Sequence, residues 1–581
     1  MSVGNLRWLV VLLSVTLVTA CKPEEPQQNG QGKGAIAFSY TLTQSEFNSL
    51  SPDNQFVVAN KVLSVMQRGV PADEFFDLSQ GFETPVVAQS NFLNTLQYDL
   101  QSPLSGEELS RQNKLIFGIS DDPNTEEDES IPPRFNELDG DQPHQITLAR
   151  MHSYPISEDQ FVLWMSYFLA NTIMFSPARE MESVDEQDIA RVLEYLQGHL
   201  SNGTGIREII KGWLHNLSRW RVSRSAENHA LEMFELYLGI FNDTPEEQQN
   251  TINGGKACAS WYLTDAGDGY QLAKNSMVIE GLESVQVFNK YVTDCDDLYD
   301  VVSGHPNLIP RVTEVIVNYF LDGSSAEEKQ RLIQNIVSSG PSRFDQIFMA
   351  AMFSKSFLLN SERPKSFEEN AMNFLHAMHW TPRCSSCYPF DRRTMSVIWD
   401  SSNNGDSAAV HNMGWAAMEY KIGRTPFLPM DALSFAVYHK GYRERVLRNT
   451  KAFDGDHFPK EADFTEADEP REPPFPIKDG AFYVAGTENL KPSLENLTVD
   501  EFIDLLFLTT MGRRATEEEM SVWLQDGLDR NFIIFDEEQS EYRMQPAGGG
   551  GEWEYYTDDY AEVILDYMSR LPETYYYRAV R

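Results

Sequence analysis

Residues 161–175 read FVLWMSYFLANTIMF, a stretch that is apolar on nearly every side when drawn as a helix. A surface helix keeps one polar face, so a helix that is apolar all round belongs inside a core. We therefore expect residues 161–175 to form a central buried helix. The chain is 41% hydrophobic and 12% aromatic, which is enough material to build a core around that helix.

Signals for helix starts recur on both sides of this segment. In a capping box, Ser or Thr is followed three residues later by Glu or Gln, and the two side chains bond backbone amides of the first turn. Such pairs occur at Ser157 and Gln160, Ser183 and Glu186, Thr244 and Glu247, Ser325 and Glu328, Ser366 and Glu369, Thr498 and Glu501, and Thr516 and Glu519. Strand patterns are few, at 36–42, 145–150 and 481–485. The sequence predicts a mainly α fold, a large multi-helix globular domain with few short strands.

Shifts in composition predict the organisation of the chain. Acidic, proline-rich stretches at 120–143 and 451–485 are typical of loops and linkers. The predicted parts are a lipoprotein signal peptide (1–20), a flexible stalk (21–35), an N-terminal region with the acidic loop (36–145), a helical core domain (146–450), a linker (451–485) and a C-terminal helical region (486–581).

The first 21 residues predict export and lipid anchoring. Arg7 precedes an apolar run from Trp8 to Val18, which has the layout of a secretory signal and is too short to span a bilayer. The sequence Val-Thr-Ala before Cys21 resembles the lipobox of bacterial lipoproteins, in which the cysteine is acylated after cleavage; the alternative is an ordinary signal peptide. Lys22 stands where an inner-membrane retention signal would have Asp. We therefore expect a lipid-anchored protein of the cell envelope, at the outer membrane.

The net charge of −40 limits the partners of the protein. Such a field repels nucleic acid and anionic headgroups, so we expect no nucleic-acid partner. The charge is compatible with cation binding, with a basic partner, or with a solvated acidic surface that has no specific ligand.

Four cysteines remain besides Cys21, and they can be joined in three ways. In an oxidising compartment an even number of cysteines indicates disulfides. We favour the pairs Cys258–Cys295 and Cys384–Cys387, since each is nearest in sequence.

His376 and His379 precede the second cysteine pair and lie three residues apart, on one helix face. Two His and two Cys side chains can hold zinc. A zinc site is therefore an alternative to the short disulfide loop, and free thiols are a third reading.

Several segments resemble the bacterial family known as domain of unknown function 1800. Residues 227–239, ENHALEMFELYLG, are similar to its ENxAxExxELxxLG helix. Residues 256–261 (KACASW) stand where the family has Ala-Leu-Thr-Gly-Trp. His305-Pro306-Asn307 matches the His-Pro-Asn start of an amphipathic helix.

Further matches follow towards the C-terminus. Ser354–Phe357 is similar to a Ser-x-x-Phe element, 423–429 (GRTPFLP) to a Gly-Gln-x-Pro-Phe segment, and the closing LPETYYYRAV to Ser-Pro-Glu-Tyr-x-x-x-Arg. The resemblance spans about residues 155–581. It implies export and, as a partner, an exported protein with a sulfatase-like fold. The family arginine before the glutamate pair is Leu231 here, so no role that needs this arginine carries over.

Two glutamates in the first of these segments form a candidate site. On a helix Asn228, Glu232 and Glu235 share one face, and carboxylates so placed can bind a cation or transfer protons. The family pattern adds His305 as their partner. The alternative is structural: a polar network that fixes helix packing, with the His305 ring capping a helix start.

Two classes of function remain open. The chain has no Gly-x-Ser-x-Gly, HExxH, P-loop or GxGxxG motif. We expect a non-catalytic binding or assembly lipoprotein without a cofactor. The tyrosines at 555–556 and 575–577 would contribute to a contact or sugar-stacking surface, or else to core packing. The other class is an exported metal-assisted hydrolase that uses Glu232, Glu235 and His305 with a divalent metal.

Overall fold

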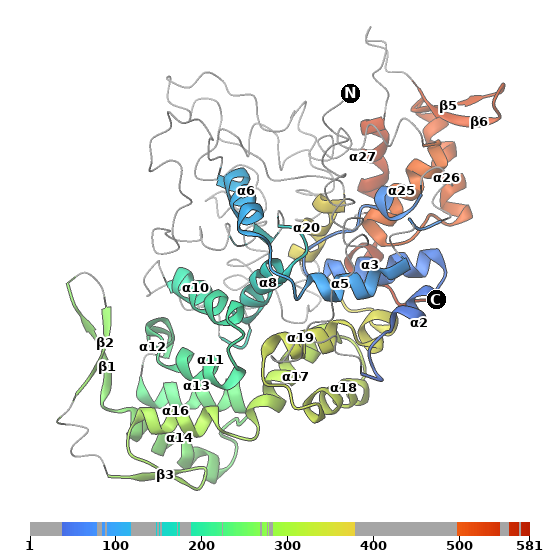
Figure 1. The fold of residues 1–581 in the computed structure, drawn as a ribbon. Coiled ribbons are helices and arrows are strands. Elements are labelled where there is room, and N and C mark those ends of the chain that lie inside the picture. Colours follow the sequence, from blue (N-terminus) through green and yellow to red (C-terminus); the bar gives the residue numbers. More distant parts are fainter. Residues whose placement is uncertain are drawn as a thin grey trace, which may run out of the picture. The chain divides into compact units, whose positions relative to one another are not determined.

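The computed structural model describes residues 38–117, 147–377, 497–545 and 557–581, with gaps at 78–83, 87–89, 148–149, 152–153, 171, 175–187, 224, 268–269, 276, 278–282, 366 and 569–570. Residues 36–581 form one compact unit (Figure 1). Cys21, the signal, the stalk, the acidic loop 120–143 and the linker 451–485 lie outside the described residues. Within those residues, no helix combines the length and apolarity that crossing a bilayer requires.

The fold is mainly α, as the sequence predicts. The helices are α2 (Gln44–Asn48), α3 (Pro52–Ser64), α4 (Ala72–Phe75), α5 (Phe92–Asp99), α6 (Gly106–Phe117), α8 (Glu158–Ala170), α10 (Asp188–Ser201), α11 (Ile206–Leu214), α12 (Leu217–Ser223), α13 (Ala226–Leu238), α14 (Pro245–Cys258), α16 (Cys295–Ser303), α17 (Leu308–Phe320), α18 (Ala326–Ser338), α19 (Phe344–Met352), the π-helix η6 (Ser356–Asn360), α20 (Phe367–Ala377), α25 (Val499–Met511), α26 (Glu517–Asp529), α27 (Thr557–Met568) and the 3-10 helix η10 (Pro572–Tyr575).

The described strands form three separate antiparallel hairpins: β1 (Trp261–Asp265) with β2 (Tyr270–Lys274), β3 (Val285–Val287) with β4 (Lys290–Val292), and β5 (Ile533–Asp536) with β6 (Glu541–Met544). None is at a predicted position. Within 36–42 only Thr41 forms an isolated bridge, Thr147 and Arg150 are helical, and 481–485 lies outside the described residues. The strand predictions at 36–42 and 145–150 are therefore wrong.

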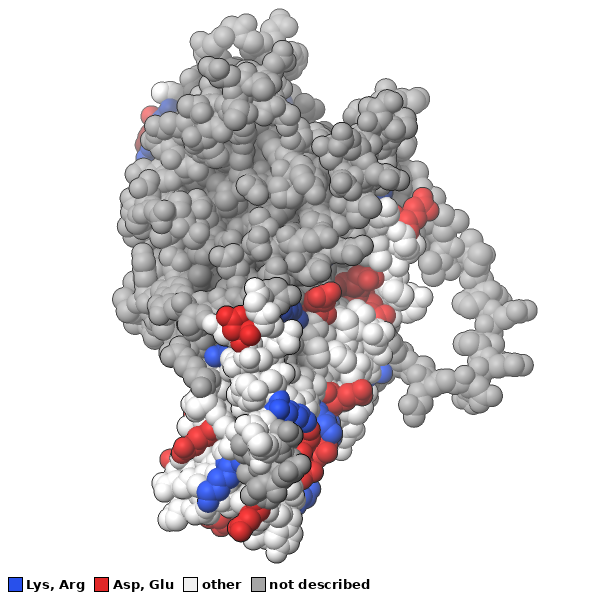
Figure 2. All heavy atoms as spheres, turned by 90° about the vertical axis from the view of Figure 1, so that its left-hand side faces the viewer, with Lys and Arg blue, Asp and Glu red and all other residues white. Residues whose placement is uncertain are grey.

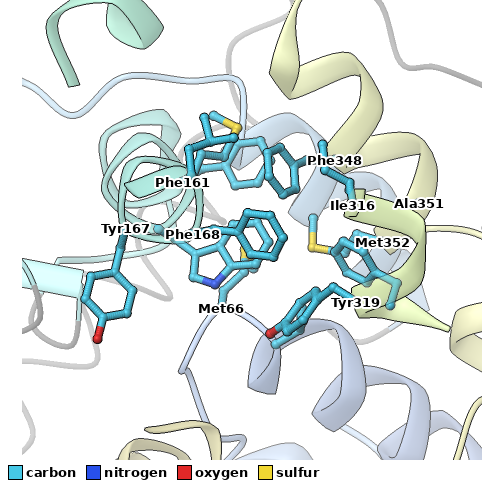
Figure 3. Close-up of a cluster of buried hydrophobic side chains, with 14 of the residues drawn as sticks. Met66, Phe161, Tyr167, Phe168, Ile316, Tyr319, Phe348, Ala351 and Met352 are labelled. Atoms are coloured by element: carbon cyan, nitrogen blue, oxygen red, sulfur yellow. The ribbon is translucent and has the colours of Figure 1, made fainter. Parts of the chain in front are cut away.

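Helix α8 is the predicted central helix. All its residues from Gln160 to Ala170 are buried, and its aromatic rings interlock with those of α17 and α19 (Figure 3). The Trp164 ring lies 5.1 Å from that of Phe348, and the Phe168 ring lies 4.9 Å from that of Tyr319. The helix ends at Ala170 and the chain turns at 172–174, so it is shorter than the predicted 161–175.

The capping prediction holds at most described positions. Thr244, Thr498 and Thr516 each form a complete capping box, and the Ser325 side chain accepts a bond from Glu328 N–H. Ser157 accepts a bond from Gln160 N–H in the same way. Ser183, Glu186 and Ser366 lie outside the described residues.

Glu369, which sequence spacing pairs with Ser366 in a capping box, lies in a buried ionic centre; Ser366 is outside the described residues, so this capping box stays a prediction. Arg363 donates two bonds to its carboxylate, of 2.5 and 3.1 Å, and Tyr319 donates a third. The Arg363 guanidinium lies 4.2 Å from the Tyr319 ring and 4.8 Å from the Tyr577 ring. Tyr319 and Tyr577 come from distant parts of the sequence, so their contacts with this ion pair hold those parts together.

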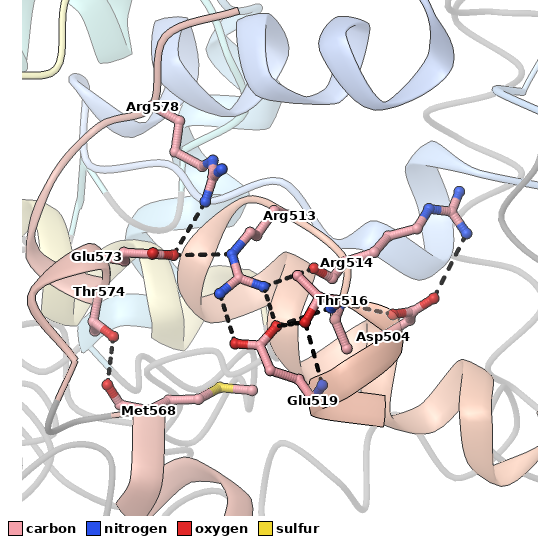
Figure 4. Close-up of polar contacts among 10 residues, drawn as sticks. Asp504, Arg513, Arg514, Thr516, Glu519, Met568, Glu573, Thr574 and Arg578 are labelled. Carbon is pink, nitrogen blue, oxygen red and sulfur yellow. Dashed lines mark hydrogen bonds and ion pairs between the residues drawn. The ribbon is translucent and has the colours of Figure 1, made fainter. Parts of the chain in front are cut away.

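The C-terminal helices pack onto the rest of the unit, since α25 contacts both α4 and α20. Arg513, just after the end of α25, connects α26 to the C-terminal segment (Figure 4). It donates two bonds to Glu519, of 2.6 and 2.8 Å, and one of 2.9 Å to Glu573. Desolvation raises the pKa of Glu519, but the bonds from Arg513 and Thr516 outweigh it and lower that pKa to about 2.

Candidate functional site

The helix that carries Glu232 and Glu235 is α13. The Ser225 side chain caps its start, and Gly239 ends it with a φ of +66°, a left-handed conformation that glycine adopts without strain. Glu232 is partly buried and its carboxylate lies 3.7 Å from the guanidinium of fully buried Arg219, on α12. Glu235 is also partly buried. Glu232 thus neutralises a buried cation, which agrees with the structural alternative.

Helix α14 packs unusually close to α13. A Cβ atom added to Gly254 would lie 2.9 Å from the Ala230 Cβ, and one added to Gly255 would lie 2.9 Å from the Glu227 Cα. Any side chain at these positions would push the two helices apart. The Gly-Gly pair therefore sets the distance between α13 and α14, and it holds the end of α14 in place.

A chain of hydrogen bonds runs through the interior from α12 to α16. The Trp220 indole N–H donates to the Tyr299 hydroxyl at 3.0 Å, and that hydroxyl lies 2.9 Å from Nε2 of His229. Nδ1 of His229 lies 2.8 Å from the Ser223 hydroxyl, which donates to the Arg219 carbonyl oxygen at 2.9 Å. The Ser223, His229 and Tyr299 side chains are fully buried.

The position of each proton in this series of hydrogen bonds follows from which groups can only accept. Ser223 uses its one proton on a carbonyl oxygen, so it accepts the proton of Nδ1 on His229. Nε2 is then an acceptor, and Tyr299 donates to it. His229 is therefore neutral, and burial together with Arg219 and His215 lowers its pKa well below 6.5. With every group satisfied, the chain locks α12, α13 and α16 together.

His305 performs the helix-start role. Its Nδ1 accepts the N–H of Asn307 at 3.1 Å, just before α17, and its ring lies 5.0 Å from that of Phe288. Burial lowers its pKa, and Lys290 and Arg207 lower it further. A positively biased surrounding disfavours both a protonated His305 and a cation bound to it.

The metal candidates are not brought together among the described residues. In that part of the chain no group of three His, Cys, Asp or Glu side chains is placed to hold a metal ion. Nδ1 of His376 lies 2.7 Å from the Gly69 carbonyl oxygen, so this ring joins α20 to the N-terminal region. His379, Cys384 and Cys387 lie outside the described residues.

A disulfide joins Cys258, the last residue of α14, to Cys295, the first of α16, which is the predicted pair. Both cysteines are fully buried. The segment between them, residues 259–294, carries both of the hairpins β1–β2 and β3–β4. We call it the disulfide-closed loop. Figure 1 shows its hairpins at the edge of the molecule, beyond the helices.

The hairpin β1–β2 has an anchored face and an outward face. On the anchored face Trp261 stacks on Trp220 of α12 at 6.0 Å, and the Lys274 ammonium lies 4.2 Å from the Trp261 ring. Tyr262 points to the other face, since neighbouring residues of a strand alternate. Its cross-strand neighbour there is Ala273, and the next pair is Thr264 with Gln271. Tyr262 is 48% exposed.

The hairpin β3–β4 is anchored by its turn. Phe288 and Asn289 have φ values of +47° and +60°, a two-residue turn in which a Phe is strained. Phe288 packs on Phe234 at 4.8 Å, and its N–H donates to Asn250 Oδ1, which holds it there. Val287 and Val292 are buried, so Tyr291 and its partner Gln286 face outward. Tyr291 is 78% exposed.

Exposed apolar side chains are concentrated around this loop. The described residues expose twelve large ones, and six of them lie between 241 and 291. Those six are Phe241, Ile252, Tyr262, Tyr270, Met277 and Tyr291. Figure 2 views the molecule from that side and shows charged side chains of both signs scattered among uncharged ones over its lower part. This concentration along the chain makes the loop the candidate contact surface among the described residues.

Of the tyrosines that the sequence suggested for a contact surface, at 555–556 and 575–577, the described ones are only partly at the surface. Tyr575 and Tyr577 are buried, so they belong to the core, whereas Tyr576 is 38% exposed. Tyr555 and Tyr556 lie outside the described residues. The tyrosines of the disulfide-closed loop were missed by sequence reasoning. Two signals in the sequence pointed to them: the alternation in WYLTD and YQLAK on either side of an Asp-Gly dipeptide, and the cysteines at the two ends of the loop.

In comparisons with known proteins, no family model, curated protein or solved structure matches this chain. The resemblance to the family of unknown function stays a prediction.

Proposed function

We propose that this protein is a non-catalytic binding lipoprotein of the cell envelope, anchored by lipid on Cys21, which contacts its ligand through the disulfide-closed loop. The observation that carries the proposal is the exposure of large apolar side chains along this loop, where all three tyrosines are at least 48% exposed. A soluble monomer gains nothing in stability from this exposure, so a ligand is its natural explanation.

The construction of the loop supports a binding role. The disulfide closes its base, the Trp261–Trp220 stack fixes one hairpin, and Phe288 fixes the other. A surface held in place before binding loses little conformational entropy when the ligand arrives. Glu232 and His305, by contrast, each have a local structural partner, and no observation favours the hydrolase.

Anchoring is tested by growing cells that express the protein with labelled palmitate and separating their membranes. We expect label in the full-length chain and none in Cys21→Ser, which should leave the membrane fraction. A Cys21→Ser protein that stays in the outer membrane would contradict lipid anchoring.

Binding is tested in cells by placing photoreactive benzoylphenylalanine at Tyr291 and, as a control, at Tyr98. Tyr98 lies on α5 and is 69% exposed, so it matches Tyr291 in exposure but lies outside the loop. We expect cross-linked products at position 291 and none at position 98. Equal products at both positions, or none, would overturn the assignment of the surface.

The hydrolase alternative is tested by metal analysis. Mass spectrometry of the protein purified without added metal, beside Glu232→Ala/Glu235→Ala, should give no stoichiometric metal that depends on these carboxylates. Metal that is present in the parent and absent from the folded variant would replace the binding proposal.

A further inference from the structure

We propose that the ligand of the disulfide-closed loop is an uncharged polysaccharide, which stacks sugar rings on Tyr262 and Tyr291; this inference rests on the proposed function. A sugar ring has an apolar face of C–H groups and a rim of hydroxyls. An exposed tyrosine ring suits the face, because it offers a flat apolar surface at the cost of few rotamers. C–H contacts to the ring electrons add a weak attraction.

The side chains beside each tyrosine suit the rim of hydroxyls. On the outward face of β1–β2, Tyr262 is accompanied by Thr264, Gln271 and Ala273. On β3–β4, Tyr291 lies directly opposite Gln286, which is exposed. Hydroxyl and amide groups both donate and accept, as sugar hydroxyls do. The cross-strand partners of the two tyrosines thus carry no charge.

The charge of the protein favours an uncharged polymer over acidic polysaccharides, nucleic acids and basic proteins. The chain carries a net charge of −40, which opposes the approach of acidic polysaccharides and nucleic acids. A basic protein would be attracted by that field, but it would be expected to meet carboxylates at the centre of its contact. The tyrosines instead have an alanine, a threonine and glutamines beside them.

Tyr262 and Tyr291 lie on separate hairpins that are anchored on different helices, so a polymer could contact both rings where a single sugar would contact one. Each stacking contact is weak by itself. When two contacts engage one chain, the second becomes intramolecular and raises the affinity without a new kind of interaction. Tyr270 is less suited to stacking, because the Arg221 guanidinium lies 4.8 Å from its ring and covers one face.

Affinity electrophoresis tests this inference with the mature full chain in non-ionic detergent. The protein would run through native gels that contain glucomannan, dextran, hydroxyethylcellulose or, as an acidic comparison, polygalacturonate. Its strong negative charge makes retardation easy to read. We expect at least one uncharged polymer to retard it, and polygalacturonate to have no effect.

Substitutions then identify the surface. Tyr262→Ala and Tyr291→Ala should each weaken retardation on the order of tenfold, about 1.4 kcal/mol, and the double variant should abolish it. Tyr291→Phe keeps the ring and should bind, and Tyr98→Ala should behave as the parent. No retardation by any uncharged polymer, or retardation that survives the double substitution, overturns the inference. A protein cross-linked at position 291 without polysaccharide retardation would overturn it and leave the proposed function standing.

Discussion

Replacing Tyr299 by Phe tests the buried hydrogen-bond chain most directly. The substitution keeps the ring, which projects from α16 and packs against the rings of His215 and His229, and removes only the hydroxyl. That hydroxyl accepts the Trp220 indole N–H at 3.0 Å and donates to Nε2 of His229 at 2.9 Å. Without it, one buried donor and one buried acceptor lose their partner.

The magnitude follows from these two groups. Leaving a buried polar group without a partner costs about 1–3 kcal/mol, so Tyr299→Phe, which leaves two such groups, should lower the free energy of unfolding by about 2–6 kcal/mol. The matched control is Tyr291→Phe, the same chemical change on a side chain that is 78% exposed. There we expect a change within about 0.5 kcal/mol.

Urea unfolding followed by tryptophan fluorescence measures the free energy of unfolding of both variants. Trp220 is itself a member of the hydrogen-bond series, so its fluorescence reports on the site of the substitution. Hydrogen exchange of peptides from α12, α13 and α16 locates the loss, which should be confined to these helices. If Tyr299→Phe costs no more than Tyr291→Phe, the hydroxyl does not connect Trp220 to His229, and the assignment of a neutral His229 loses its basis.

Three further perturbations follow from the same region. Below about pH 6.5 an unfolded histidine binds a proton that folded His229 does not, so His229 should lower the free energy of unfolding by up to about 1.4 kcal/mol for each unit by which the pH falls. Urea titrations at pH 7.5 and 5.5 should show that His229→Gln reduces the pH dependence by this share, while the share of His305, whose pKa is also lowered, remains. A slope unchanged in the variant would show that His229 is not the group responsible. Gly255→Ala would place a Cβ 2.9 Å from the Glu227 Cα and should lower the melting temperature. Gly198→Ala on α10, which has open space around it, is the control and should raise the stability by up to about 1 kcal/mol. Equal effects of the two substitutions would contradict the close approach of α13 and α14. Removing the disulfide with Cys258→Ala/Cys295→Ala should lower the free energy of unfolding by up to about 4 kcal/mol, because the bond joins residues 37 apart. Reductant should have no further effect on the urea unfolding of this variant. A parent protein that is as unstable as the variant under oxidising conditions would contradict the disulfide.

Local signals in the sequence were reliable where a short-range rule decides the outcome. The all-apolar run at 161–170 had to be buried, because no orientation of that helix offers water a polar face. Thr244, Thr498 and Thr516 cap helices since their partner amides are three residues away, whatever the rest of the fold does. The mainly α class follows from such signals taken together.

Roles that depend on a distant partner were not decided by spacing. The spacing of Glu369 from a serine gave no sign that its carboxylate is buried and accepts a hydrogen bond from Tyr319, which lies 50 residues earlier. Glu232 shares a helix face with Glu235, but buried Arg219 determines its environment. In both cases an ion pair inside the protein outweighs a pattern at its surface, because an unpaired buried charge is costly.

The sequence by itself determined the helical class, the helix starts, the nearest-neighbour pairing of Cys258 with Cys295, and the signal for export and lipid attachment at Cys21, which stays a prediction. Only the tertiary structure decided which aromatic side chains reach solvent. Tyr577 packs against Arg363 in the core, whereas Tyr262 and Tyr291 face outward, because α12 and Phe288 fix which face of each hairpin is covered. Burial is settled by what packs on a side chain, and those partners come from parts of the chain that no local pattern connects.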